Sequence, residues 1–167
     1  MSHLKYLSGY PSIVTDQARH LIEQNKLADY LLNKYPNTHK FGNNKALYSF
    51  TMQIKNQFIR QSSPLSKVVY DDKIDTIHHA LGLHSFVSRV QGNKLKSKNE
   101  IKIGSVFKKV PIEFLTMIVV HELAHLKEKQ HNKAFYKLCV HMEAEYHQLE
   151  LDMRLYLTHI NLTGKLY

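Results

Sequence analysis

The fold is organised around one apolar stretch, residues 111–125, which reads PIEFLTMIVVHELAH. Pro111 suits the first turn of a helix, and Ile112 to Lys129 contains neither Gly nor Pro, so the sequence predicts a helix over this range. Apolar residues cover most of its circumference, which predicts that the helix is buried. Polar side chains within such a helix require partners.

Two histidines and a glutamate lie near the end of this predicted helix. His121 and His125 are one turn apart on the same face, so their imidazoles can converge on one cation. Glu122 lies next to that face, where its carboxylate could reach a metal-bound water without binding the metal. His131 would supply a third nitrogen if the helix ends before it and the chain turns back. Three protein ligands leave one position of a tetrahedral zinc open, as in catalytic sites. The alternative is that these side chains are merely hydrogen-bonded polar groups of the core.

The sequence around these residues resembles a known family. Residues 119–128, VVHELAHLKE, and 131–136, HNKAFY, are similar to the signature of the YgjP-like metallopeptidases, small bacterial proteins related to SprT-type and WLM-type zinc proteases. The resemblance extends from residues 6–11 to residues 154–158. It therefore covers nearly the whole chain.

The resemblance implies a cofactor and a set of roles. Zn2+ would be held by His121, His125 and His131, and Glu122 would be the catalytic acid/base. The spacing from His125 to His131 also equals that of metzincins, but Glu128 stands where a metzincin has its turn-forming Gly. This departure favours a helix that continues about one turn beyond His125.

We expect an α+β fold with a zincin-like minimal metalloprotease domain over residues 65–167. It would contain a small antiparallel sheet, the active-site helix and C-terminal helices. Residues 1–64 would form an N-terminal helical segment packed on this catalytic part. Within that segment, helical spacing of apolar residues predicts an amphipathic helix or helix pair over 12–34 and a second helix over 45–61.

Strand patterns precede the active-site helix. Residues 67–70 form a short strand candidate, and 85–95 and 100–107 alternate on either side of the turn-rich residues 96–99. The last two segments predict an antiparallel hairpin immediately before the helix. An edge strand there could pair with an extended peptide and lay it across the metal.

The chain after His131 reads as two further helices. Asn132 can cap the first, and Ala134, Phe135, Leu138, Cys139 and Met142 would form its apolar stripe. By resemblance a break follows near residues 143–144, and residues 146–157 form the final helix.

Further candidates for the site come from these C-terminal helices. Zincins often add a side chain that stabilises the oxyanion, and carboxylates usually orient the ligand imidazoles. The oxyanion candidates are Tyr136, Tyr146 and His147, and the carboxylate candidates are Glu143, Glu145 and Glu150. Tyrosines on amphipathic helices are more often core or rim residues. A cluster of His78, His79 and His84 could form an auxiliary metal site, but exposed or hydrogen-bonded imidazoles are the simpler interpretation.

Composition indicates which binding partners and which cellular compartment to expect. The chain has 167 residues, a formal net charge of +9 and the single cysteine Cys139, which we expect to be a buried thiol. We see no apolar stretch of signal-peptide or membrane-spanning length, so we expect a cytoplasmic protein that does not contact a membrane. Residues 89–109 carry seven basic side chains and one acid, Glu100, which makes nucleic acid a possible partner.

The leading functional prediction is a cytoplasmic zinc-dependent metallopeptidase that hydrolyses peptide bonds of a protein or peptide substrate. A metal-bound water would attack the carbonyl, with Glu122 as general acid/base. One alternative is a zinc-stabilised binding module whose metal is structural, with nucleic acid as its candidate partner. Another keeps the catalytic metal but directs it at a non-peptide amide or ester.

Overall fold

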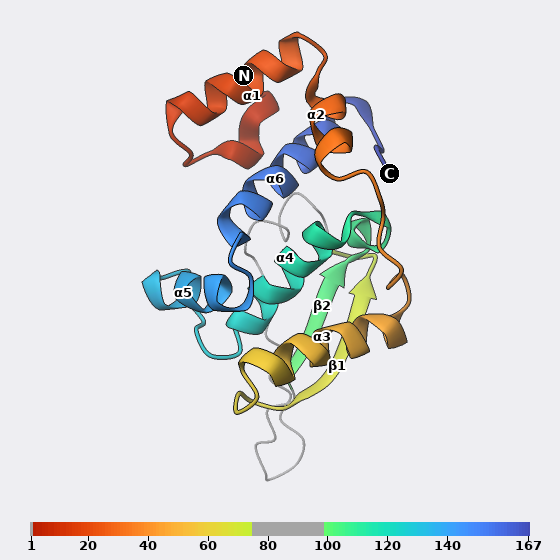
Figure 1. The fold of residues 1–167 in the computed structure, drawn as a ribbon, viewed down its shortest axis with the longest axis vertical. Coiled ribbons are helices and arrows are strands. Elements are labelled where there is room, and N and C mark those ends of the chain that lie inside the picture. The colour runs from red at the N-terminus through yellow and green to blue at the C-terminus, as the bar shows by residue number, and fades with distance from the viewer. Residues whose placement is uncertain (1, 75–98) are drawn as a thin grey trace.

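The computed structural model describes residues 2–74 and 99–167 (Figure 1). Helices dominate, and two short strands pair beside them. In chain order the elements are η1 (Ser2–Leu7), α1 (Ser12–Glu23), α2 (Leu27–Lys34), α3 (Asn44–Phe58), β1 (Leu65–Asp71), β2 (Asn99–Gly104), η2 (Ser105–Lys109), α4 (Ile112–Ala124), α5 (Lys133–Met142) and α6 (Tyr146–Thr163). This mixture agrees with the predicted α+β class.

Helix α4 lies at the centre of the fold, between the strands and α6 (Figure 1). Of its 13 residues, 10 are buried, as the apolar circumference predicted. The regular helix ends at Ala124, earlier than the predicted end at Lys129. No helix within the described ranges, α4 included, is long and apolar enough to cross a membrane.

The sheet differs from the prediction. β1 contains the predicted strand 67–70, but it pairs with β2 in parallel, with Val68 opposite Ile101 and Tyr70 opposite Ile103. The antiparallel sheet is therefore wrong for the described strands. The alternating pattern of β2 indicated which side chains face the core, but it does not specify the direction of the neighbouring strand. Parallel neighbours need a long connection, here residues 72–98. The other arm of the expected hairpin, 85–95, lies outside the described residues.

The N-terminal helices follow the predicted apolar spacing. The range 12–34 forms the helix pair α1 and α2, which Asn25 separates with a positive φ of 55° that asparagine tolerates. Helix α3 covers most of the predicted range 45–61, and Asn43 caps it by accepting a hydrogen bond from the Ala46 N–H at 2.8 Å. Helix α3 packs on β1, and α2 packs on α6.

A buried carboxylate joins α2 to α6. Asp152, which is 0% exposed, accepts hydrogen bonds from Tyr30 Oη at 2.9 Å and from Lys34 Nζ at 2.8 Å. Tyr35 Oη donates a short hydrogen bond to the same carboxylate, and Gln148 Nε2 donates at 3.3 Å. Several donors compensate the cost of burying the charge, so this cluster holds the N-terminal helices onto the body of the protein.

Asp152→Ala should lower the free energy of unfolding by about 3 kcal/mol, because it leaves the buried Tyr35 phenol and the half-buried Tyr30 phenol without an acceptor. The contribution of Lys34 is discounted, since its side chain is 40% exposed. Urea denaturation would measure the change. Asp16→Ala is the control, because the Asp16–Arg19 pair is exposed and should contribute less than about 0.5 kcal/mol. Equal losses in the two variants would contradict the assigned role of Asp152.

Candidate metal site

The structure brings the three predicted ligand side chains together at the end of α4. The Nε2 atom of His125 lies 3.2 Å from Nε2 of His121 and 3.0 Å from Nε2 of His131, and the remaining pair is 3.3 Å apart. These three residues form a group that could hold a metal ion. Two of them are fully or nearly buried, with exposed fractions of 7% for His121 and 1% for His125.

The spacing of the three nitrogens fits a small cation. Zinc–nitrogen bonds of about 2.0–2.1 Å at tetrahedral angles place neighbouring ligand nitrogens about 3.3 Å apart. Nδ1 of His125 donates a hydrogen bond to the Glu128 carbonyl at 2.9 Å, so in the neutral ring Nε2 carries the lone pair. A cation among the three Nε2 atoms would use such lone pairs. The donor set thus fits zinc and other first-row metals.

A turn, rather than a further helical turn, brings His131 back to the site. After Ala124 the Leu126 N–H donates to the Leu123 carbonyl at 3.0 Å and the Lys127 N–H donates to the Ala124 carbonyl at 3.1 Å, so each bond spans three residues instead of four. The expected continuation of the regular helix for about one turn beyond His125 is therefore wrong. The His125 ring takes up the carbonyl of Glu128, so that carbonyl does not extend a helical ladder, and the chain reverses.

The next helix holds His131 from the other side. Asn132 Oδ1 accepts a hydrogen bond from the Phe135 N–H at 2.9 Å and caps α5, as predicted. Cys139 on the same helix is buried, also as predicted. His131 itself is more exposed than the other two histidines. Its pKa is lowered mainly by burial, while Glu150 opposes that shift and Arg154 adds to it.

Glu122 follows His121 in the chain and lies inside the protein. It is 8% exposed, and burial raises its pKa to about 8. Burial disfavours the charged form of a carboxyl and so raises its pKa. A cation held by the three Nε2 atoms would lower the pKa again. A carboxyl with these properties can take up and return a proton near neutral pH.

The Phe135 ring packs against all three imidazoles. Its ring centroid lies 4.9 Å from that of His121, 4.4 Å from that of His125 and 4.9 Å from that of His131. The sequence placed Phe135 in the apolar stripe of its helix, which is correct, but the spacing gave no sign that one ring contacts all three imidazoles. The sequence feature that came closest to indicating this contact was the predicted cap at Asn132, which places the start of α5, and with it Phe135, near His131.

Tyr146 lies behind the site. Its Oη is 2.8 Å from Nδ1 of His121, on the side of the ring opposite the converging Nε2 atoms. This position does not suit the stabilisation of an oxyanion. The other two candidates, Tyr136 and His147, contact each other with ring centroids 5.5 Å apart. They remain the candidates for that role.

Two of the predicted carboxylates have partners other than the imidazoles. Glu143 Oε1 accepts a hydrogen bond from the Glu145 N–H at 3.1 Å, and Glu150 pairs with Arg154 at 2.9 Å while its charge also raises the pKa of His131. Nδ1 of His121 contacts a phenol, and Nδ1 of His125 contacts a backbone carbonyl. The predicted auxiliary cluster of His78, His79 and His84 lies outside the described residues, and so do residues 89–98 of the basic region.

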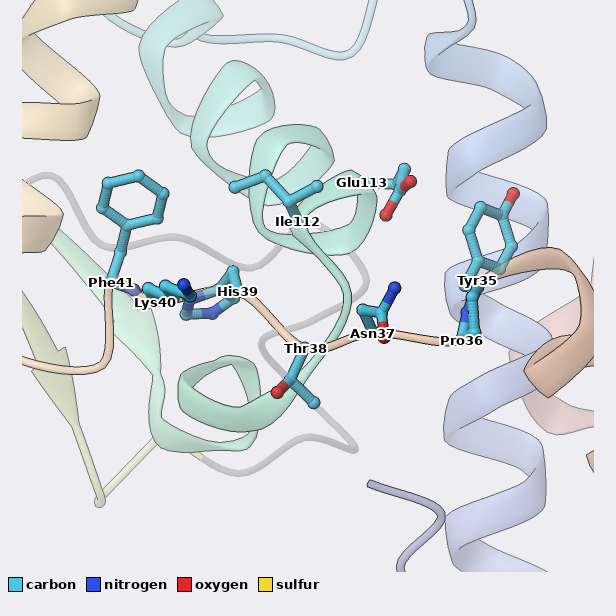
Figure 2. A pocket seen from close by; sticks show the side chains of 9 residues that line it. All are labelled: Tyr35, Pro36, Asn37, Thr38, His39, Lys40, Phe41, Ile112 and Glu113. Carbon is cyan, nitrogen blue, oxygen red and sulfur yellow. Dashed lines mark hydrogen bonds between the residues drawn. The ribbon is translucent and has the colours of Figure 1, made fainter.

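A separate cavity lies at the opposite end of α4 (Figure 2). Its volume is about 360 Å³, and it is lined by the linker 35–41 together with Ile112 and Glu113. Ile112 precedes His121 by nine residues and His125 by 13, which separates the cavity end of the helix from these histidines by about 13–20 Å at 1.5 Å per residue. The cavity is therefore not part of the metal site.

Comparisons with known proteins agree with the motif. The family model described as "YgjP-like, metallopeptidase domain" matches residues 81–155, which include all three histidines and Glu122. The chain is 57% identical over 162 residues, 97% of each chain, to a protein of Escherichia coli (strain K12) named UTP pyrophosphatase. No solved structure gives a significant match. Both descriptions are those of hydrolytic enzymes, although they differ in substrate. The identity over nearly the full length shows that this chain belongs to the YgjP-like family.

Proposed function

We propose that this protein is a metal-dependent hydrolase of nucleoside triphosphates, with UTP as the first substrate to test. The observation that carries the proposal is the 57% identity, over 97% of both chains, to the Escherichia coli UTP pyrophosphatase. The converging histidines supply a site at which such chemistry can take place. Water would add to the α-phosphorus, the bond from that phosphorus to the bridging oxygen would break, and the products would be UMP and pyrophosphate.

The side chains of the site have separate proposed roles in this reaction. His121, His125 and His131 would hold the cation, for which we propose Zn2+ because three imidazoles suit it. When bound, the cation supplies Lewis acidity and neutralises phosphate charge. Glu122 would accept the proton of the attacking water. Its burial and its place directly after His121 in the chain support this role.

The charge around the third histidine supports an anionic substrate. Residues 126–137 contain four lysines and one acid, Glu128. Positive charge at the mouth of a site raises the local concentration of a polyanion such as a triphosphate. A neutral peptide would gain nothing from this charge. The lysines are Lys127, Lys129, Lys133 and Lys137, and all four are exposed.

Hydrolysis of peptide bonds is the second candidate function. The order His121-Glu122-x-x-His125 with a third histidine, together with the description of the family model, favours it. Glu122 would then return the proton to the departing amine. On this alternative residues 65–167 would constitute a zincin-like domain, with residues 1–64 as a helical segment packed on it.

A purely structural metal is less well supported. Within the described ranges, the group of potential ligands around His121 contains no fourth His, Cys, Asp or Glu. A closed structural zinc site usually has four protein ligands. We also propose a cytoplasmic location, which the buried free thiol of Cys139 supports. Nucleic-acid binding through the basic region 89–109 stays a prediction.

Parallel assays distinguish the two substrates. In the first assay the purified Zn2+-bound protein is incubated with UTP, and release of pyrophosphate is measured. In the second it is incubated with an unfolded protein, and new amino termini are measured. We expect UTP hydrolysis that a chelator abolishes and that added Zn2+ restores. Cleavage of the unfolded protein without hydrolysis of UTP would overturn the nucleotide proposal in favour of the peptidase.

A further inference from the structure

The His121 ring is held from behind by the C-terminal helices. Tyr146 is the first residue of α6 and is 0% exposed, and its Oη lies 2.8 Å from Nδ1 of His121. Cys139 of α5 is 0% exposed, and burial raises the pKa of its thiol while the neighbouring Tyr146 hydroxyl opposes that rise. Buried side chains from α4, α5 and α6 thus lie in series behind the metal position.

The direction of the hydrogen bond between His121 and Tyr146 follows from the lone pair that a metal ligand needs. For Nε2 of His121 to bind a cation, its lone pair must be free, so the ring proton sits on Nδ1 and is donated to Tyr146 Oη. The phenol proton can then be donated to Cys139 Sγ, since a thiol sulfur is a weak acceptor. Each polar atom then has a partner inside the protein, as buried groups require.

We propose that Tyr146 is a positioning residue that holds His121 in the tautomer with the proton on Nδ1 and points its Nε2 at the metal position. The neighbouring Cys139 thiol offers a weak acceptor for the hydroxyl hydrogen of Tyr146. Residues that contact the second nitrogen of a ligand histidine orient the ring, and their loss typically weakens metal binding about 10- to 100-fold. The proposal rests on the metal site of the proposed function but not on its substrate.

The test is Tyr146→Phe in the full chain. Phenylalanine fills the same space but leaves the Nδ1–H of His121 without its acceptor, which favours the other tautomer or a rotated ring. We expect Zn2+ affinity, measured by competition with a chromophoric chelator, to fall about 10- to 100-fold. Tyr156→Phe is the matched control, because Tyr156 is a buried tyrosine of the same helix whose ring packs on Phe114. The control should bind Zn2+ like the unaltered protein.

A second measurement separates positioning from stability. Imidazole nitrogen NMR of the metal-free protein should show His121 protonated on Nδ1, and Tyr146→Phe should shift it toward a mixture of tautomers. Unchanged affinity together with an unchanged tautomer in Tyr146→Phe would overturn the proposal, whatever happens to the melting temperature. If that variant does not fold, a His121 ring protonated on Nε2 in the unaltered metal-free protein would overturn it equally. None of these measurements depends on turnover, so failure of the UTP assay leaves them interpretable.

Discussion

Glu122→Gln is expected to reduce kcat about 10²- to 10⁴-fold while leaving the metal content unchanged. The amide has nearly the same shape as the carboxyl and can occupy the same buried position, which is 8% exposed in the native side chain. It cannot accept a proton from water, and general acid–base catalysis of this kind contributes about 10²–10⁴ in rate. The expectation holds for UTP and for a peptide, because both candidate reactions assign the same step to Glu122. Turnover and metal content should be measured on the same preparation.

Glu113→Gln is the control for this experiment. Glu113 lies on the same helix, in its first turn, and lines the cavity at the end opposite the histidines. Its replacement should leave kcat within about twofold, as expected for a change remote from the reacting atoms. Full activity of Glu122→Gln would remove the carboxyl from the mechanism and would favour a site whose metal has no catalytic role.

His125→Ala is expected to weaken metal binding about 10²- to 10³-fold and to abolish hydrolysis with it. Binding of structural zinc by four ligands is worth about 10–16 kcal/mol, so loss of one ligand costs about 3 kcal/mol, or roughly 10²- to 10³-fold in affinity. The variant also loses the hydrogen bond from Nδ1 to the Glu128 carbonyl, which helps to form the turn leading to His131. Titration with Zn2+ should therefore show weak binding and little increase in melting temperature.

His20→Ala serves as the control, since His20 is exposed on α1. It should bind Zn2+ with unaltered affinity. A His125→Ala protein that still bound Zn2+ tightly would show that the cation is held elsewhere. Complete unfolding of the unaltered protein on removal of metal, with activity unaffected by Glu122→Gln, would instead identify a structural metal.

Local sequence rules worked well where the interactions themselves are local. The apolar circumference of residues 112–124 and the cap at Asn132 each depend on residues within a few positions, and the structure contains both. The spacing of His121 and His125 on one helical face has the same origin. The point at which α4 ends was missed, because hydrogen bonds from Leu126 and Lys127 to carbonyls three residues earlier replace the α-helical pattern there, and helix propensity does not describe that change.

The sequence by itself determined the central helix, the family and which three histidines come together, since all depend on residues at short, regular separations. The role of Glu122 stays a prediction. Only the tertiary structure decided that β1 and β2 run parallel, that Phe135 contacts all three imidazoles, and that Tyr146 contacts His121. The reason is physical: helical and strand periodicity specify which face of an element is buried. They do not specify which distant element covers that face, and Tyr146 meets His121 across 25 positions of the chain.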